Sequence, residues 1–174
     1  MEIPHKTTFS GKEVDRKQPE ISEVVRAVLL EMQTEMTNVT LERALWLAEQ
    51  VKAKAREMGV KAVVAVADNA GHPILVQSMD GAYIASYDVA LNKSFTVVSL
   101  KMSTSTLKPL AQPGGSLYGI QFTNGGKIVI FGGGEPLVGR SGQIVGGLGV
   151  SGGSEEQDTA LAAYGKQVFE QQYS

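Results

Sequence analysis

The chain has 174 residues, a net charge of −2 at pH 7 and a hydrophobic fraction of 43%, which suits one globular domain with a buried core. It contains no cysteine, so disulfides, thiolate catalysis and zinc–cysteine sites are excluded and a cytoplasmic location is expected. Charges of both signs are scattered without a basic patch, which argues against a nucleic-acid partner. No apolar run reaches the roughly 18 residues of a membrane span, and no secretory signal is expected at the N-terminus.

Residues 1–37 are predicted to form a flexible tail that carries one short amphipathic helix. Residues 1–20 are polar and lack any periodicity. The next stretch, ISEVVRAVLLEM (21–32), repeats apolar residues at the spacing of one helix face. This predicted stripe consists of Ile21, Val24, Val25, Val28, Leu29 and Met32. Because a helix this short is marginal in water, the stripe is expected to pack on its own domain or oligomer, on a partner, or on a membrane surface.

Residues 38–174 are predicted to form the folded domain. A helix over residues 41–58 has Thr40 as its N-cap candidate and Gly59 just beyond its end. Two strands, 60–68 and 72–79, follow as a hairpin around the turn DNAG. A further helix begins near Ala82, and residues 105–126 form a short helix and a loop.

The last third of the chain reads as three strands and a helix. GKIVIFGGG (126–134) is predicted to be a strand, and residues 135–150 a hairpin that turns at 140–142. The last helix begins near Ser154. Strands joined by short turns pair antiparallel, so the order predicts an α+β fold: a five-stranded antiparallel sheet covered by helices on both faces, in α/β/α layers.

The stretch GGLGVSGG (146–153) contains the pattern G-x-G-x-x-G of dinucleotide-binding proteins. That reading needs a second strand after the helix that follows, whereas residues 154–174 are filled by one predicted helix. Two interpretations remain. Either these glycines allow close backbone packing, or they form a wall of a ligand site together with Gly132, Gly133 and Gly134.

Three stretches of the chain together resemble one protein family. They are residues 64–100, FGGGEPLV (131–138) and GQIVGGLGVSGGSEEQDTALAAYG (142–165). Their order and spacing are similar to the GlcG/HbpS family, which includes the C-terminal domain of PduO. The resemblance implies a profilin-like fold, assembly into dimers or larger homo-oligomers, and binding of haem or another tetrapyrrole, such as a corrinoid, in some members.

The helix at 21–32 also resembles the short targeting helices that direct enzymes into bacterial microcompartments. That resemblance implies docking on a shell or cargo protein and a location inside a microcompartment. The alternative of packing on its own domain or oligomer stays open.

The candidate site residues come from the hairpin, the central helix and the glycine-rich strands. They are His72, Met79, Asp80, Lys93, Gly133, Gly134, Glu135, Gly149 and Ser151. His72 is either an exposed turn residue or an axial haem ligand, which must then face a pocket or a dimer interface. Asp80 is a helix cap or a ligand contact, and Lys93 a solvated residue or an anion anchor. No metal-binding spacing of histidines is present.

Three functions follow as hypotheses. The favoured one is an accessory protein of a catabolic operon or microcompartment that binds a small molecule such as haem or a corrinoid. The second is a small enzyme of the isomerase or lyase type, acting on a hydroxy- or keto-acid, with Asp80, Lys93 or Glu135 as acid or base. The third is a non-catalytic assembly protein.

Overall fold

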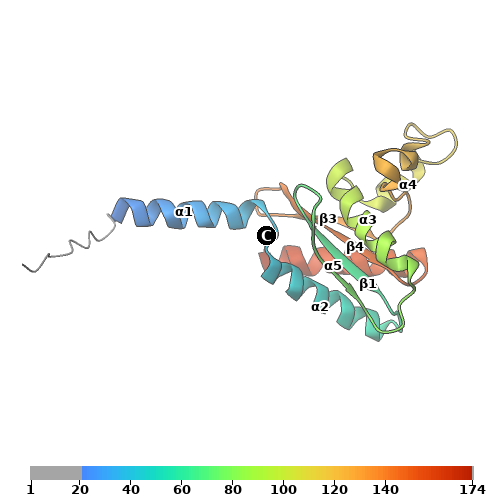
Figure 1. The fold of residues 1–174 in the computed structure, drawn as a ribbon, viewed down its shortest axis with the longest axis horizontal. Coiled ribbons are helices and arrows are strands. Elements are labelled where there is room, and N and C mark those ends of the chain that lie inside the picture. Colours follow the sequence, from blue (N-terminus) through green and yellow to red (C-terminus); the bar gives the residue numbers. More distant parts are fainter. Residues whose placement is uncertain (1–20, 174) are drawn as a thin grey trace, which may run out of the picture.

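The computed structural model describes residues 21–173, apart from the side chains of residues 31–36. Residues 1–20 of the predicted tail and the side chain of Met32 therefore lie outside the described residues. In Figure 1 a twisted sheet lies between two layers of helices, and α1 (Ile21–Thr37) projects away from them. This α/β/α arrangement confirms the predicted α+β class.

The sheet has four antiparallel strands in the described residues: β1 (Val63–Asp68), β2 (Pro73–Ser78), β3 (Gly134–Val138) and β4 (Ile144–Ser151). Their order across the sheet is β2-β1-β4-β3. The two central strands are almost wholly buried, as expected for strands covered on both faces. Strands β2 and β3 therefore form the two edges of the sheet.

The helices divide between the two faces of the sheet. Helix α3 (Ala85–Leu100) covers one face, and α2 (Leu41–Glu57) and α5 (Glu155–Tyr173) cover the other (Figure 1). The short helix α4 (Thr104–Leu110) and the turns η1 (Ile120–Phe122) and η2 (Asn124–Gly126) follow α3. The Thr40 hydroxyl accepts the N–H of Arg43 at 3.3 Å, which confirms the predicted N-cap.

The main hydrophobic core lies between the sheet and the α2–α5 layer. Leucines and valines from both layers fill it, and Phe169 is its largest fully buried apolar side chain. On the opposite face the sheet presents small residues to α3, so the helix backbone lies close to the strands. A Cβ atom on Gly149 would lie 2.0 Å from the carbonyl oxygen of Ala90.

The prediction of five strands is wrong, because residues 126–133 do not join the sheet. In this segment the N–H of Val129 donates to the Thr96 hydroxyl of α3 at 3.0 Å. Ile128 and Val129 are buried, so their apolar character reflects packing as a loop rather than strand pairing. The helix predicted near Ala82 begins at Ala85, since Gly81 at φ 79° forms a turn first.

The apolar stripe of α1 is exposed along its described length. The exposed fractions range from 47% at Val24 to 84% at Ile21, and Figure 1 shows the helix standing clear of the sheet. The helix also continues to Thr37, beyond the predicted end at residue 32. Within residues 21–173, no helix is both long and apolar enough to cross a membrane.

Candidate functional site

Two adjoining cavities form a groove where α2, β2 and β4 all end. Their volumes are about 500 and 290 Å³, and they share Gly59, Val60 and Lys61. We call this surface the basic groove. Its other lining residues are Lys52, Arg56, Ser78, Met79, Asp80, Gly81, Tyr83, Gly152, Gly153 and Gln157.

Glycines form much of the wall of the basic groove: Gly59, Gly81, Gly152 and Gly153 all line it. Gly59 ends α2 in the left-handed region at φ 67°, which favours glycine. A Cβ atom on Gly152 would lie 2.4 Å from the carbonyl oxygen of Lys61. The groove therefore presents backbone atoms, and its side-chain chemistry comes from the rim.

The rim carries an excess of positive charge. Lys52, Arg56 and Lys61 contribute three cations against the single carboxylate of Asp80. Lys52 also bonds Glu49 at 2.6 Å, whereas Arg56 and Lys61 form no ion pair with any residue in 21–173. Two unpaired cations beside one cavity attract an anionic ligand.

Besides the Asp80 carboxylate, two side chains with metal-ligand chemistry, those of Met79 and Tyr83, line the same groove. The sulfur of Met79 accepts the N–H of Ala62 at 3.4 Å, and the side chain packs against the core, so it serves the fold. Tyr83 is 73% exposed and its hydroxyl has no hydrogen bond to the described residues. Tyr83 is thus the side chain free to contact a ligand.

Lys93 is not the solvated helix residue of one expectation, since its side chain is 0% exposed. Its ammonium group donates to the carbonyl of Val150 at 2.7 Å and to Asp158 at 3.0 Å. The ring of Phe131 lies 4.9 Å away. Burial lowers the pKa of Lys93, and the Asp158 carboxylate opposes that shift.

The buried pair also holds the wall of the basic groove. The second carboxylate oxygen of Asp158 accepts the N–H of Gly153 at 2.9 Å, and Gly153 lines the groove. Lys93 bonds β4 three residues earlier, at Val150. Lys93 and Asp158 therefore fix the turn from β4 into α5, which makes them positioning residues.

The other glycine-rich candidates pack around Lys93 and α3. A Cβ atom on Gly133 would lie 2.6 Å from the Lys93 nitrogen. The N–H of Gly134 donates to the buried Thr104 hydroxyl at 2.9 Å, and the Ser151 hydroxyl bonds that of Ser86 at 3.1 Å. For Gly133, Gly134 and Gly149, close packing is therefore the reading that the structure favours, whereas Gly152 and Gly153 reach the groove.

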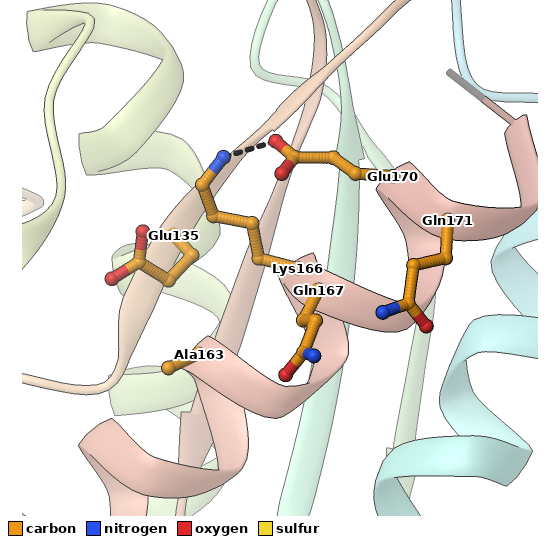
Figure 2. A pocket seen from close by; sticks show the side chains of 6 residues that line it. All are labelled: Glu135, Ala163, Lys166, Gln167, Glu170 and Gln171. Carbon is orange, nitrogen blue, oxygen red and sulfur yellow. Dashed lines mark hydrogen bonds and ion pairs between the residues drawn. The ribbon is translucent and has the colours of Figure 1, made fainter.

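Glu135 lies in a different groove, between β3 and the outer side of α5. Figure 2 shows its carboxylate beside Lys166, whose ammonium group turns to Glu170 instead. Burial is the main cause that raises the pKa of Glu135. Ala163, Gln167 and Gln171 complete this second groove. Glu135 is thus separated from Lys93 by the sheet.

His72 lies at the opposite end of the β1–β2 hairpin from the basic groove. Its imidazole Nδ1 is 3.4 Å from the Asp68 carboxylate, and its side chain is 80% exposed. His72 lines none of the four cavities described for residues 21–173. No group of three or more histidine, aspartate or glutamate residues within 21–173 is placed to hold a metal ion.

Three basic residues of the groove escaped the sequence analysis. Lys52 and Arg56 are four residues apart and so share one face of α2. Basic residues at this spacing occur on any solvent-exposed helix, so the pattern does not indicate a binding site. Lys61 joins them only because Gly59 ends the helix and turns the chain. The convergence of these side chains depends on the fold, whereas Met79 and Asp80 were singled out from the hairpin itself.

The chain is similar to one described family and to proteins of two bacteria. The family described as haem-degrading protein HbpS-like matches residues 39–167. An uncharacterised 15.0 kDa protein of the dhaT-dhaS intergenic region of Citrobacter freundii is 44% identical over 128 residues, covering 74% of this chain and 89% of that protein. The corrinoid adenosyltransferase PduO of Salmonella typhimurium is 40% identical over 109 residues, 63% of this chain but only 32% of PduO.

A solved structure of similar fold is a complex with haem. The PduOC:haem complex superposes with a TM-score of 0.71 at 35% sequence identity, covering 75% of this chain and 94% of that one. The match to the family spans the whole sheet and the four helices α2 to α5 up to residue 167. The chain therefore belongs to the HbpS-like family, which confirms the resemblance found in its sequence.

Proposed function

We propose that the chain is an accessory protein that binds a tetrapyrrole with free carboxylates, haem in the first place, in the basic groove. The observation that carries this proposal is that Arg56 and Tyr83 line the two adjoining cavities of the basic groove, with Lys61 at both. The haem complex of a relative that is 35% identical supports the choice of ligand.

The groove residues fit the parts of haem. The guanidinium of Arg56 and the ammonium groups of Lys52 and Lys61 suit the two propionates, because charge-assisted hydrogen bonds to carboxylates are the strong ones. The hydroxyl of Tyr83 is a known type of haem-iron ligand. The glycines of the wall have no side chains that would project into the space of a macrocycle.

A corrinoid is the second ligand of this proposal, supported by the PduO relative. The side chains of cobalamin are neutral amides apart from one phosphodiester, so three cations on the rim favour haem over cobalamin. A direct comparison of the two ligands on the same protein tests this preference.

The test is a titration of the purified protein with haemin, followed by absorbance, beside a parallel titration with cobalamin. We expect a saturable, shifted Soret band. The double substitution Arg56→Glu with Lys61→Glu should lower the affinity for haemin at least tenfold. Lys54→Glu with Lys101→Glu is the matched control, because it makes the same charge change outside the groove. Non-saturating responses, or equal loss in both double variants, would contradict the proposal.

The exposed stripe of α1 favours a second, separate role as a docking helix. We propose that Val25, Leu29 and their neighbours bind a shell or cargo protein of a bacterial microcompartment. Both residues are about half exposed, so Val25→Glu with Leu29→Glu should leave the fold intact. Loss of co-sedimentation with purified microcompartments is expected for that variant but not for Glu23→Gln, which alters the polar face.

The enzyme hypothesis receives less support from the geometry. Asp80 lines the basic groove, Lys93 of α3 is buried against β4 and α5, and Glu135 faces α5. An acid and a base that act on one substrate must both reach it. These three side chains occupy three separate places, so the binding role is the better proposal.

A further inference from the structure

The two edges of the sheet differ in how they are protected. At β3, the N–H of Val150 donates to the carbonyl of Gly133 at 2.8 Å, so Gly134 and Pro136 direct their backbone groups outward. The Gly134 N–H is taken by Thr104, and Pro136 has no N–H. This edge therefore offers little to an incoming strand.

The edge at β2 has no such protection. The N–H of Met79 donates to the carbonyl of Ala62 at 3.0 Å, so the alternation of the ladder turns the N–H groups of Val76 and Ser78 away from β1. Neither group has a partner among residues 21–173. The strand PILVQS also carries no charge, which leaves it open to pairing with another strand.

A second copy of β2 is the occupant that fits this edge best. Antiparallel pairing of a strand with itself forms a closed two-fold interface, and an uncharged strand sets no like charges opposite one another. A buried side-chain oxygen of Gln77 also lacks a donor within the described residues. Ile84 lies six residues after the end of β2 at Ser78 and is 96% exposed.

Such pairing would carry His72 to the basic groove. Within one copy, about 20 Å of extended strand separates His72 from Met79. In an antiparallel pair centred near Val76, the start of one β2 lies beside the end of the other, so His72 of the second copy comes beside the segment 78–82. That segment forms the groove rim, through Ser78, Met79, Asp80 and Gly81.

We propose that two copies of the chain pair along β2 and that His72 of each copy contributes to the ligand site of the other. This inference rests on the proposed haem-binding function. The Asp68 carboxylate lies near Nδ1 of His72, which leaves Nε2 for the ligand. An imidazole supplied in trans would give haem iron a histidine ligand that residues 21–173 of the same copy do not place at the groove.

The interface is tested without ligand by sedimentation of the full chain. Val76→Pro and Ser78→Pro each remove one outward N–H while leaving the ladder to β1 intact, and both should yield monomers. Glu135→Lys, on the protected edge, is the control and should leave the assembly unchanged. Circular dichroism checks that each variant folds. Because Ser78 is exposed, Ser78→Pro should disturb the fold less than Val76→Pro. An unchanged assembly in a folded Ser78→Pro variant would overturn the interface.

The trans contribution is tested by mixing two variants. His72→Ala keeps the groove, and Arg56→Glu with Lys61→Glu keeps the histidine. If the site spans two copies, a mixed dimer has one intact site. After subunit exchange in equal amounts, about a quarter of all sites should regain the wild-type Soret spectrum. No recovery, although sedimentation of tagged chains demonstrates mixed dimers, would place His72 outside the site.

The two proposals fail in different ways. If the unchanged protein binds no haemin, the proposed function and the role of His72 are both overturned. Sedimentation of Val76→Pro and Ser78→Pro then tests the interface by itself. If haemin binds and His72→Ala leaves the Soret spectrum unaltered, the groove function stands and the trans contribution is overturned.

Discussion

The ammonium nitrogen of Lys93 lies 3.0 Å from the carboxylate of Asp158, and both side chains are buried. The pair joins α3 to α5 across the end of β4. Removing one partner would leave a buried charge without compensation, which is among the more costly changes in a protein.

Lys93→Met should therefore reduce the free energy of unfolding by about 3–5 kcal/mol. Adding Asp158→Asn removes the remaining charge while keeping an oxygen for the Gly153 N–H. The double variant should recover most of the stability that Lys93→Met loses. Denaturant titrations of the single and the double variant measure this. A small loss in the single variant would mean that the pair is not essential to the turn between β4 and α5.

Gly149→Ala should also destabilise the fold, by about 3 kcal/mol, because overpacking forces the backbone apart. The new Cβ would lie 2.0 Å from the Ala90 carbonyl oxygen, and a backbone atom cannot move aside like a flexible side chain. Thermal unfolding measures the effect. Gly125→Asn is the control, since no atom lies within 4 Å of its Cβ position and asparagine tolerates the left-handed backbone.

Glu135 should make the stability depend on pH. Burial raises the pKa of this carboxyl above 4.5 in the folded chain, so the folded state binds a proton more readily than the unfolded state. The stability that this supplies is present below pH 4.5 and is lost as the pH rises through the raised value. Glu135→Gln should then be more stable than the unchanged chain near pH 7.

The difference between Glu135→Gln and the unchanged chain should shrink as the pH falls towards 4.5. Urea titrations at several pH values measure it. Glu156→Gln is the comparison, because the pKa of Glu156 is lowered instead, chiefly by hydrogen bonds to its own backbone N–H and to Ser154. The same trend in both variants would mean that burial of Glu135 is not its cause.

Tyr83→Phe should leave stability unchanged, since the side chain is 73% exposed. If the phenol oxygen binds iron, the haemin complex of this variant should lose its charge-transfer absorbance and shift its Soret band. Tyr118→Phe is the control, because Tyr118 is 63% exposed and lies outside the basic groove. Identical spectra for Tyr83→Phe and the unchanged protein would assign the iron to another ligand.

Local signals were enough to predict most of the helices and strands. Thr40 and Ser154 cap helices as expected, and the hairpin turn at 140–142 follows from Gly142 in the left-handed region. The prediction of a strand at KIVIF is wrong because this segment packs against α3 and does not pair with a neighbouring strand. A buried hydroxyl, that of Thr96, satisfies its backbone in place of a ladder, and periodicity cannot reveal such a partner.

The candidate site was harder to predict than the fold. The sequence predicts Lys93 to be a solvated residue or an anion anchor on the central helix, yet its partner is Asp158, 65 residues away. Arg56, Lys61 and Tyr83 line adjoining cavities only because α2, the hairpin and β4 end at one place. Local sequence patterns indicate helix faces and caps, whereas the position of these side chains around one groove depends on the whole topology.

The glycine wall has a consequence for how this protein can change over time. Where the inner surface of a cavity is backbone, its outline is tied to the fold, and substitutions at Gly152 collide with the chain itself. The rim is free of that constraint, since Arg56, Lys61 and Tyr83 can be exchanged without disturbing a packed neighbour. Descendants of one ancestor can thus keep an unaltered cavity and acquire new ligands through a few rim residues.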